Sequence, residues 1–214
     1  MQIPKNVISA IAEPKPRTAA ERNEAHDRRL KMRNAMTAHF LKMGYTATTI
    51  SDVLAEHATA IKLDKWRFDK PQKGLALMGN VGTGKTTAMT IMAGLFDWRV
   101  FRIYEMAGHY ADMGDAWLNM IIRDYWEKKT IVLDDLGSEA DVKHYGVTLP
   151  VSDIICVRYD HWKRNGVRTY FTGNLTEQDR VNRYGKRADD RMFEMCEIIP
   201  CVGPSFRRVA NKTT

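Results

Sequence analysis

Cysteine is scarce in this chain, and its scarcity excludes two kinds of protein. The 214 residues include three cysteines, Cys156, Cys196 and Cys201. An odd and sparse set suits a reducing compartment better than a disulfide framework. There is also no Cys-x-x-Cys or His-x-x-x-His pattern, so we expect no structural zinc site.

Long apolar runs are absent as well. No stretch approaches the roughly 18 consecutive apolar residues that a membrane-spanning helix needs. The first 30 residues are charged, are interrupted by Pro4, Pro14 and Pro16, and lack the apolar core of a signal peptide. We therefore expect a cytoplasmic protein that has no membrane partner.

Positive charge is concentrated near the two ends. Residues 1–73 hold 14 Lys and Arg against 8 Asp and Glu, and residues 180–214 hold 8 against 4. Basic arms of this kind suit nucleic acid or an acidic protein surface. Solubility alone is the other interpretation.

One motif indicates nucleotide chemistry. The pattern G-x-x-x-x-G-K-[ST] is matched in full by Gly79, Asn80, Val81, Gly82, Thr83, Gly84, Lys85 and Thr86. An apolar strand-like stretch, 75–78, precedes it, and a helical stretch, 87–95, follows. Backbone N–H groups of the octet and of Thr87 are expected to surround the phosphates of ATP. Lys85 is expected to reach the β- and γ-phosphates and Thr86 to ligate Mg²⁺.

A second acidic segment completes the expected magnesium site. Residues 130–133 read as a buried strand, and Asp134 and Asp135 follow directly. Two acids at the end of a buried strand are costly unless a cation or hydrogen bonds compensate them. We expect Asp134 to organise Mg²⁺ and Asp135 to polarise the attacking water. Many ATPases place Glu where Asp135 lies, so Glu139 is a candidate to assist.

Polar residues further along add to the site. Asn174 follows the predicted strand 168–172 and can hydrogen-bond a water near the γ-phosphate, although Asn is also common in ordinary turns. Arg187 and Arg191 are four residues apart and share one helix face. Cations clustered in this way can reach the γ-phosphate of a neighbouring copy as arginine fingers. Arg207 offers another cation near the C-terminus, and a solvated basic face is the alternative for all three.

The chain divides into two parts. From Lys73 onward, strands alternate with helices, which indicates an α/β fold with a parallel sheet covered on both faces. The predicted strands are 74–78, 99–104, 130–134, 168–172 and 197–200, and 150–164 reads as an amphipathic helix ended by Gly166. We divide the chain into a basic helical region, 1–70, and an ATP-binding domain, 71–214.

Helical spacing in the first part leaves two interpretations open. Met32, Met36, Phe40 and Met43 recur at helical intervals, and a second helix is expected from Ser51 to about residue 67. The apolar stripe is either a docking face for a partner helix or a face that packs on the main domain.

The ordered motifs resemble those of the AAA+ ATPases of the DnaC-type helicase loaders and of the IstB-type transposition helpers. The matching segments cover roughly residues 60–210 and are 79–86, 133–139, 172–176, 184–192 and 205–207. The resemblance implies a P-loop NTPase (AAA+) three-layer fold with a five-stranded parallel sheet of order 5-1-4-3-2. It also implies ATP-driven assembly into an open spiral.

Residue roles follow from the same resemblance. Asn174 corresponds to the sensor I residue and Arg207 to the sensor II arginine. Arg187 and Arg191 fall in the segment that holds the arginine finger, with Arg191 as the first choice. The N-terminal region is short for this family and carries no cysteine cluster, and little chain follows the last strand to form a lid.

Three functions are consistent with these observations. The leading one is a weak, partner-stimulated ATPase that loads a replicative helicase or assists DNA replication, binding single-stranded DNA and acting as a homo-oligomer. The second is a transposition helper that acts on duplex DNA with a transposase. The third is an ATP-switched adaptor with little turnover, which the shorter side chain of Asp135 keeps open.

Overall fold

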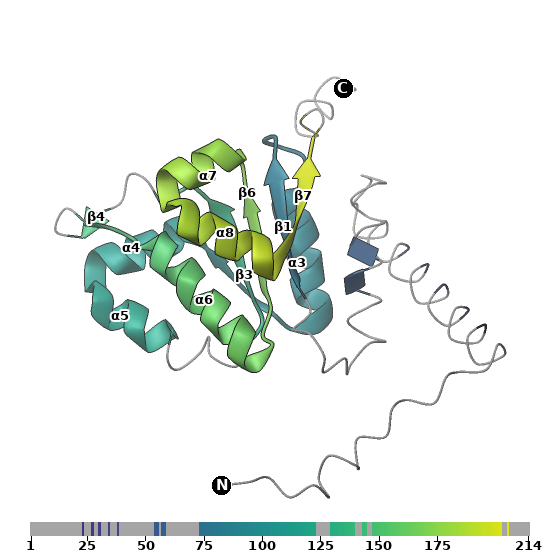
Figure 1. Ribbon diagram of the computed structural model, residues 1–214, viewed down its shortest axis with the longest axis horizontal. Coiled ribbons are helices and arrows are strands. Elements are labelled where there is room, and N and C mark those ends of the chain that lie inside the picture. Colours follow the sequence, from purple (N-terminus) through teal and green to yellow (C-terminus); the bar gives the residue numbers. More distant parts are fainter. Residues whose placement is uncertain are drawn as a thin grey trace, which may run out of the picture.

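A computed structural model gives the structure of the chain (Figure 1). It describes residues 73–122, 129–139, 143–144, 147–202 and 205, together with Asn23, Asp27, Leu30, Asn34, Ala38, Leu54, Ala55, His57 and Ala58.

A five-stranded parallel sheet forms the centre of the described part of the chain. Its strands are β1 (Gly74–Gly79), β2 (Arg99–Arg102), β3 (Ile131–Leu136), β6 (Thr169–Gly173) and β7 (Cys196–Cys201). They lie in the order β2-β3-β6-β1-β7. If these five strands are numbered 1 to 5 in chain order, the order across the sheet is 2-3-4-1-5. This is the expected order 5-1-4-3-2 read from the opposite edge, so the expectation is confirmed.

Helices cover both faces of this sheet. They are α3 (Lys85–Phe96), α4 (Ile103–Met113), α5 (Asp115–Met120), α6 (Val151–Asn165), α7 (Glu177–Tyr184) and α8 (Lys186–Met195). Between β3 and α6, the two-residue strands β4 (Lys143–His144) and β5 (Val147–Thr148) form an antiparallel pair. In Figure 1, α6 and α8 lie on one side of the sheet and α3 on the other.

The two faces of the sheet carry separate apolar cores. Alternate side chains of a strand point to opposite faces, so Leu75 and Leu77 of β1 pack with α3, whereas Ala76 and Met78 pack on the side of α4, α6 and α8. Because both faces are buried, the strands read as nearly continuous apolar runs. The short α7 is held by a capping box between Thr176 and Asp179.

Element boundaries agree closely with the prediction from sequence, with one correction. The amphipathic helix predicted at 150–164 is α6, followed by Gly166 as expected. The second predicted strand is too long, since β2 ends at Arg102 and α4 begins at Ile103. Ile103 is fully buried. An apolar residue at the first position of a buried helix cannot be told from a strand residue by periodicity alone.

Part of the N-terminal region packs on the sheet. Leu54, Ala55 and Ala58 are helical, have no exposed surface, and belong to the same apolar cluster as α3. This packing favours the interpretation that the second N-terminal helix packs on the main domain. The stripe of Met32, Met36, Phe40 and Met43 lies outside the described residues. Within the part that the structure describes, no helix is both long and apolar enough to cross a membrane.

Candidate functional site

The octet lies between the end of β1 and the first turn of α3. Gly82 has φ 81° and Gly84 has φ 84°, in the left-handed region that a residue with a Cβ seldom adopts. Gly84 is also the N-cap of α3. The two glycines that the motif requires, Gly79 (φ 135°) and Gly84, thus both have positive φ, as does Gly82 at a position that the motif leaves open. Free N–H groups of α3 begin where the loop ends.

Lys85 links this loop to β6. Its Nζ donates hydrogen bonds to the carbonyl oxygens of Gly79 at 2.9 Å and Asn80 at 2.6 Å, and to Oδ1 of Asn174 at 2.7 Å. Burial lowers the pKa of Lys85, and nearby acidic groups, including Asp135, oppose this effect. A lysine bound by three oxygens is held at the centre of the site rather than extended into solvent.

Thr86 and Asp134 meet as the sequence predicts. The Thr86 hydroxyl donates to Oδ1 of Asp134 at 2.9 Å, and Asp134 is only 3% exposed. Hydroxyl and carboxylate oxygens are the ligands that Mg²⁺ prefers, usually with several waters retained. The donor set at this point therefore fits a magnesium ion.

Asp135 has an unusual backbone. Its φ is 64°, and the β3–β6 pairing is irregular between Leu133 and Leu136. Its side chain lies 3.5 Å from Nδ2 of Asn174. Burial raises the pKa of Asp135, the charge of Asp134 raises it further, and Lys85 opposes both. Non-glycine residues in the left-handed region are concentrated at functional sites.

Thr172 contacts both acids, and it is not among the site residues predicted from the sequence. Its hydroxyl donates to Oδ1 of Asp134 at 2.6 Å and accepts the backbone N–H of Asp135 at 2.9 Å. The available signal was its place two residues before Asn174. The strands β3 and β6 are parallel neighbours, so their carboxyl ends lie at the same edge of the sheet. A polar residue near the end of β6 therefore lies close to the acids near the end of β3.

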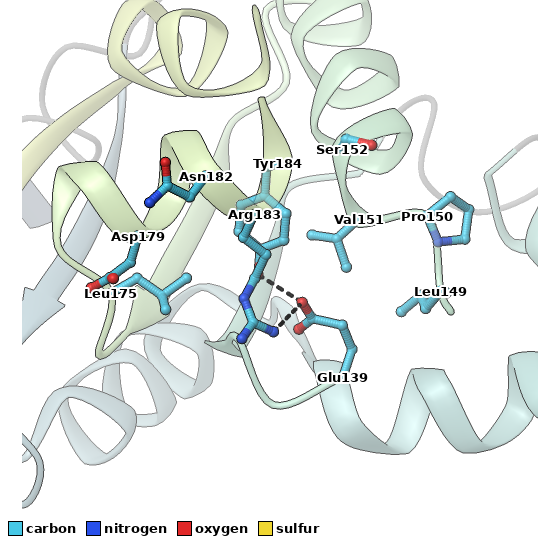
Figure 2. Close-up of a pocket in the computed structure, with 10 residues that line it drawn as sticks. All are labelled: Glu139, Leu149, Pro150, Val151, Ser152, Leu175, Asp179, Asn182, Arg183 and Tyr184. Carbon is cyan, nitrogen blue, oxygen red and sulfur yellow. Dashed lines mark hydrogen bonds and ion pairs between the residues drawn. The ribbon is translucent and has the colours of Figure 1, made fainter. Parts of the chain in front are cut away.

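Glu139, the candidate to assist Asp135, is held by hydrogen bonds to Gly137, Tyr184 and Arg183. One carboxylate oxygen accepts the Gly137 N–H at 3.0 Å, and the other accepts the Tyr184 hydroxyl at 3.0 Å and Arg183 at 3.3 Å. Figure 2 shows these last two contacts at the wall of a pocket of about 620 Å³. The carboxylate thus ties the loop after β3 to α7, a structural role.

The arginines of α8 differ in their surroundings. Arg191 is held by α6: it lies 3.3 Å from the carbonyl oxygen of Cys156 and 3.8 Å from Asp160, and its guanidinium stacks 4.9 Å from the Tyr159 ring. Arg187 is exposed in the first turn of α8. No other described residue forms a hydrogen bond or ion pair with it.

Ser205 lies beside the octet 79–86. A Cβ built on Gly82 would lie 2.0 Å from Oγ of Ser205, so the two residues are in direct contact. Arg207 lies outside the described residues. A second pocket, of about 740 Å³, borders the same loop at Asn80 and Val81 and extends to Asn174 and Phe193.

Comparison with known proteins shows likeness in structure only. No protein-family model and no curated protein sequence matches the chain. The crystal structure of DnaI is similar over 72% of this chain and 83% of that one, with a TM-score of 0.52 and 21% identity. AMPPCP-bound DnaA from Aquifex aeolicus is similar over 78% of this chain and 50% of that one, with a TM-score of 0.50 and 12% identity. The DnaC helicase loader matches over 70% of this chain and 91% of that one, with a TM-score of 0.48 and 21% identity. The likeness to DnaI and DnaA shows that the chain has the fold of the AAA+ P-loop NTPases.

Proposed function

We propose that this chain is a Mg²⁺-dependent ATPase that loads a replicative helicase or otherwise assists DNA replication. The observation that carries the ATPase proposal is the convergence of three elements at one edge of the sheet. Lys85 bonds Asn174 at 2.7 Å, and Thr86 bonds Asp134 at 2.9 Å. Three segments, the octet with the start of α3, the strand β3 and the residue after β6, thus come together here. They bring a cation (Lys85), a pair of oxygen ligands for Mg²⁺ (Thr86 and Asp134) and a polar amide (Asn174).

Each of these side chains has a defined role toward ATP. The N–H groups of the loop and of the first turn of α3 bind the phosphates, and Lys85 neutralises their charge. Mg²⁺ bound at Thr86 and Asp134 would neutralise charge that develops on the phosphate oxygens. Asp135 and Asn174 orient the attacking water. The binding of AMPPCP, an ATP analogue, by DnaA supports ATP as the nucleotide.

Assembly of several copies would complete the site. Arg187 is exposed and free to reach the γ-phosphate of a neighbouring copy, whereas Arg191 must first leave Tyr159 and Asp160. Motif position favours Arg191 and exposure favours Arg187, so both belong to the test. In this arrangement hydrolysis is weak for the single chain and rises on assembly.

The replication role rests on the order of the motifs and on charge. The motifs resemble those of helicase loaders, and the basic excess lies in residues 1–73 and 180–214. We assign binding of the helicase to residues 1–70 and ATP to residues 71–214. Single-stranded DNA would contact the basic surfaces, where phosphate contacts make binding sensitive to salt.

The test is ATP hydrolysis by the purified full-length chain, alone and with single- or double-stranded DNA. Lys85→Ala should abolish ATP binding. Loss of an arginine finger should lower stimulated turnover by about a thousandfold and leave ATP binding intact. Arg187→Ala and Arg191→Ala are compared with Arg164→Ala, which removes an exposed arginine at the end of α6.

Each outcome has a distinct meaning. Stimulation by single strands together with loss in one finger variant supports a loader. Stimulation by duplex DNA alone supports a transposition helper. If ATP binds tightly, nothing stimulates turnover, and neither arginine matters, the spiral assembly is wrong and an ATP-switched adaptor takes its place.

A further inference from the structure

Thr172 is a buried residue near the end of β6, and its hydroxyl joins the two acids of the site. The residue is 1% exposed. Its Oγ donates to Oδ1 of Asp134 at 2.6 Å and accepts the N–H of Asp135 at 2.9 Å. A hydroxyl has one hydrogen to donate and two lone pairs to accept with. Both bonds therefore form at the same time.

The first bond fixes the carboxylate of Asp134. Oδ1 also accepts the Thr86 hydroxyl at 2.9 Å, so two hydroxyl groups from different elements hold one oxygen. Neither of these bonds uses Oδ2. Held in this way, the carboxylate has one preferred orientation toward a Mg²⁺ ion or the waters around it, and a second layer of hydrogen bonds commonly orients metal ligands like this.

The second bond fixes the backbone of Asp135. The β3–β6 ladder is irregular between Leu133 and Leu136, and Asp135 lies within this irregular stretch with φ 64°. The Thr172 hydroxyl accepts the Asp135 N–H at that point. A left-handed conformation persists at a non-glycine residue only when its surroundings enforce it, and this bond is one such constraint.

We propose that Thr172 is a positioning residue that orients Asp134 for Mg²⁺ and Asp135 for the attacking water. This inference rests on the proposed ATPase function. Thr172 acts through the two acids and not by contact with nucleotide. A valine at this position would keep the branched shape but would offer neither a donor nor an acceptor, and a serine would keep both.

The chain offers a matched control on the same strand. Thr169 is also 1% exposed, and its hydroxyl accepts a hydrogen bond from Nε of Arg158 at 2.7 Å. It lies at the opposite end of β6 from the acids. Thr169→Val therefore removes a buried, hydrogen-bonded hydroxyl from β6 without touching the site.

The experiment compares wild type, Thr172→Val, Thr172→Ser and Thr169→Val as full-length chains. Binding of a fluorescent ADP is titrated first without Mg²⁺ and then with increasing Mg²⁺, thermal unfolding is recorded, and kcat and KM for ATP are measured. For Thr172→Val we expect ADP affinity without Mg²⁺ to stay within about twofold of wild type. The Mg²⁺ concentration needed for half of the response should rise about ten- to a hundredfold, as for loss of a hydrogen bond to a charged group. The value of kcat should fall with little change in KM, and Thr172→Ser should recover most of both.

Three results would overturn the inference. Wild-type Mg²⁺ dependence and kcat in Thr172→Val would show that the hydroxyl positions nothing. An equal change in Thr169→Val would show general loosening of β6. If the valine variant does not fold, Thr172→Ser and Thr172→Ala replace it, and equal Mg²⁺ dependence in these two has the same meaning. A folded wild type that binds no nucleotide would overturn the proposed function, and the inference with it.

Discussion

Acidification should destabilise the protein through His57, which lies in the N-terminal segment that packs on the sheet. Its Nε2 lies 2.9 Å from the Tyr170 hydroxyl, and the two rings meet edge to face with centroids 5.6 Å apart. Tyr170 is fully buried and stacks on Trp98 at 4.4 Å. Burial, and secondarily the positive charge of Arg168, lowers the pKa of His57 from 6.5 to about 4.

The sign and size of the effect follow from this pKa. Between about pH 6.5 and pH 4, the unfolded chain binds a proton at His57 that the folded chain does not bind. The stability contributed by neutral His57 is therefore present above pH 6.5 and is lost as the pH falls toward 4. The full difference corresponds to about 3 kcal/mol, a large part of the 5–15 kcal/mol of a typical domain.

Urea unfolding of the full-length chain between pH 7.5 and pH 4.5 measures this effect. His57→Gln does not titrate, and its amide can still hydrogen-bond the Tyr170 hydroxyl. Other groups titrate equally in both proteins, so the wild type should lose up to about 3 kcal/mol more than the variant. The control is His109→Gln, at an exposed histidine of α4, and it should follow the wild type. If His57→Gln shows the wild-type pH profile, His57 is not held neutral against Tyr170 and the reasoning is refuted.

Three further predictions concern packing. Leu54→Ala should lower the free energy of unfolding by about 2–5 kcal/mol in urea titrations, because Leu54 is fully buried, and a cost below 1 kcal/mol would contradict its packing beside α3. Asp189→Ala should cost about 3–5 kcal/mol in the same assay, since it leaves the buried Arg180 without the carboxylate that lies 2.6 Å away, and a neutral result would refute this. Gly82→Ala should weaken nucleotide binding at least about tenfold, because its Cβ would meet Ser205 at 2.0 Å in a left-handed backbone, and unchanged affinity in a fluorescent-ADP titration would show that the loop tolerates a Cβ.

Local patterns were enough to predict most of the fold. The apolar runs of β1, β3 and β6 are short and are bounded by loop residues, and α6 has a clear 3.6-residue period. Strands and helices of this kind depend on near neighbours in sequence and on burial of a whole face, both of which a sequence displays. The boundary at Ile103 was wrong because a single buried apolar residue fits either element.

The candidate site also has parts that local sequence predicts and parts that it does not. The octet 79–86 and the pair Asp134 and Asp135 are each consecutive in sequence, so each could be recognised from its own residues. Together they predicted a nucleotide site, although 48 residues separate Thr86 from Asp134. Contacts between segments that no motif marks were not predictable in this way. Thr172 contacts Asp135, which lies 37 residues away in the sequence. Glu139 contacts Tyr184, which lies 45 residues away.

Consecutive residues were thus enough to predict the α/β alternation, the octet 79–86 as a candidate phosphate-binding loop, and the two acids near the end of β3. The folded structure was needed to show that Lys85 bonds Asn174 and that His57 packs on Tyr170. It was also needed to show that Arg191 stacks on Tyr159 while Arg187 is exposed. Those pairings depend on sheet order and on helix packing. Both are set by burial summed over the whole chain, and no short stretch of sequence contains that sum.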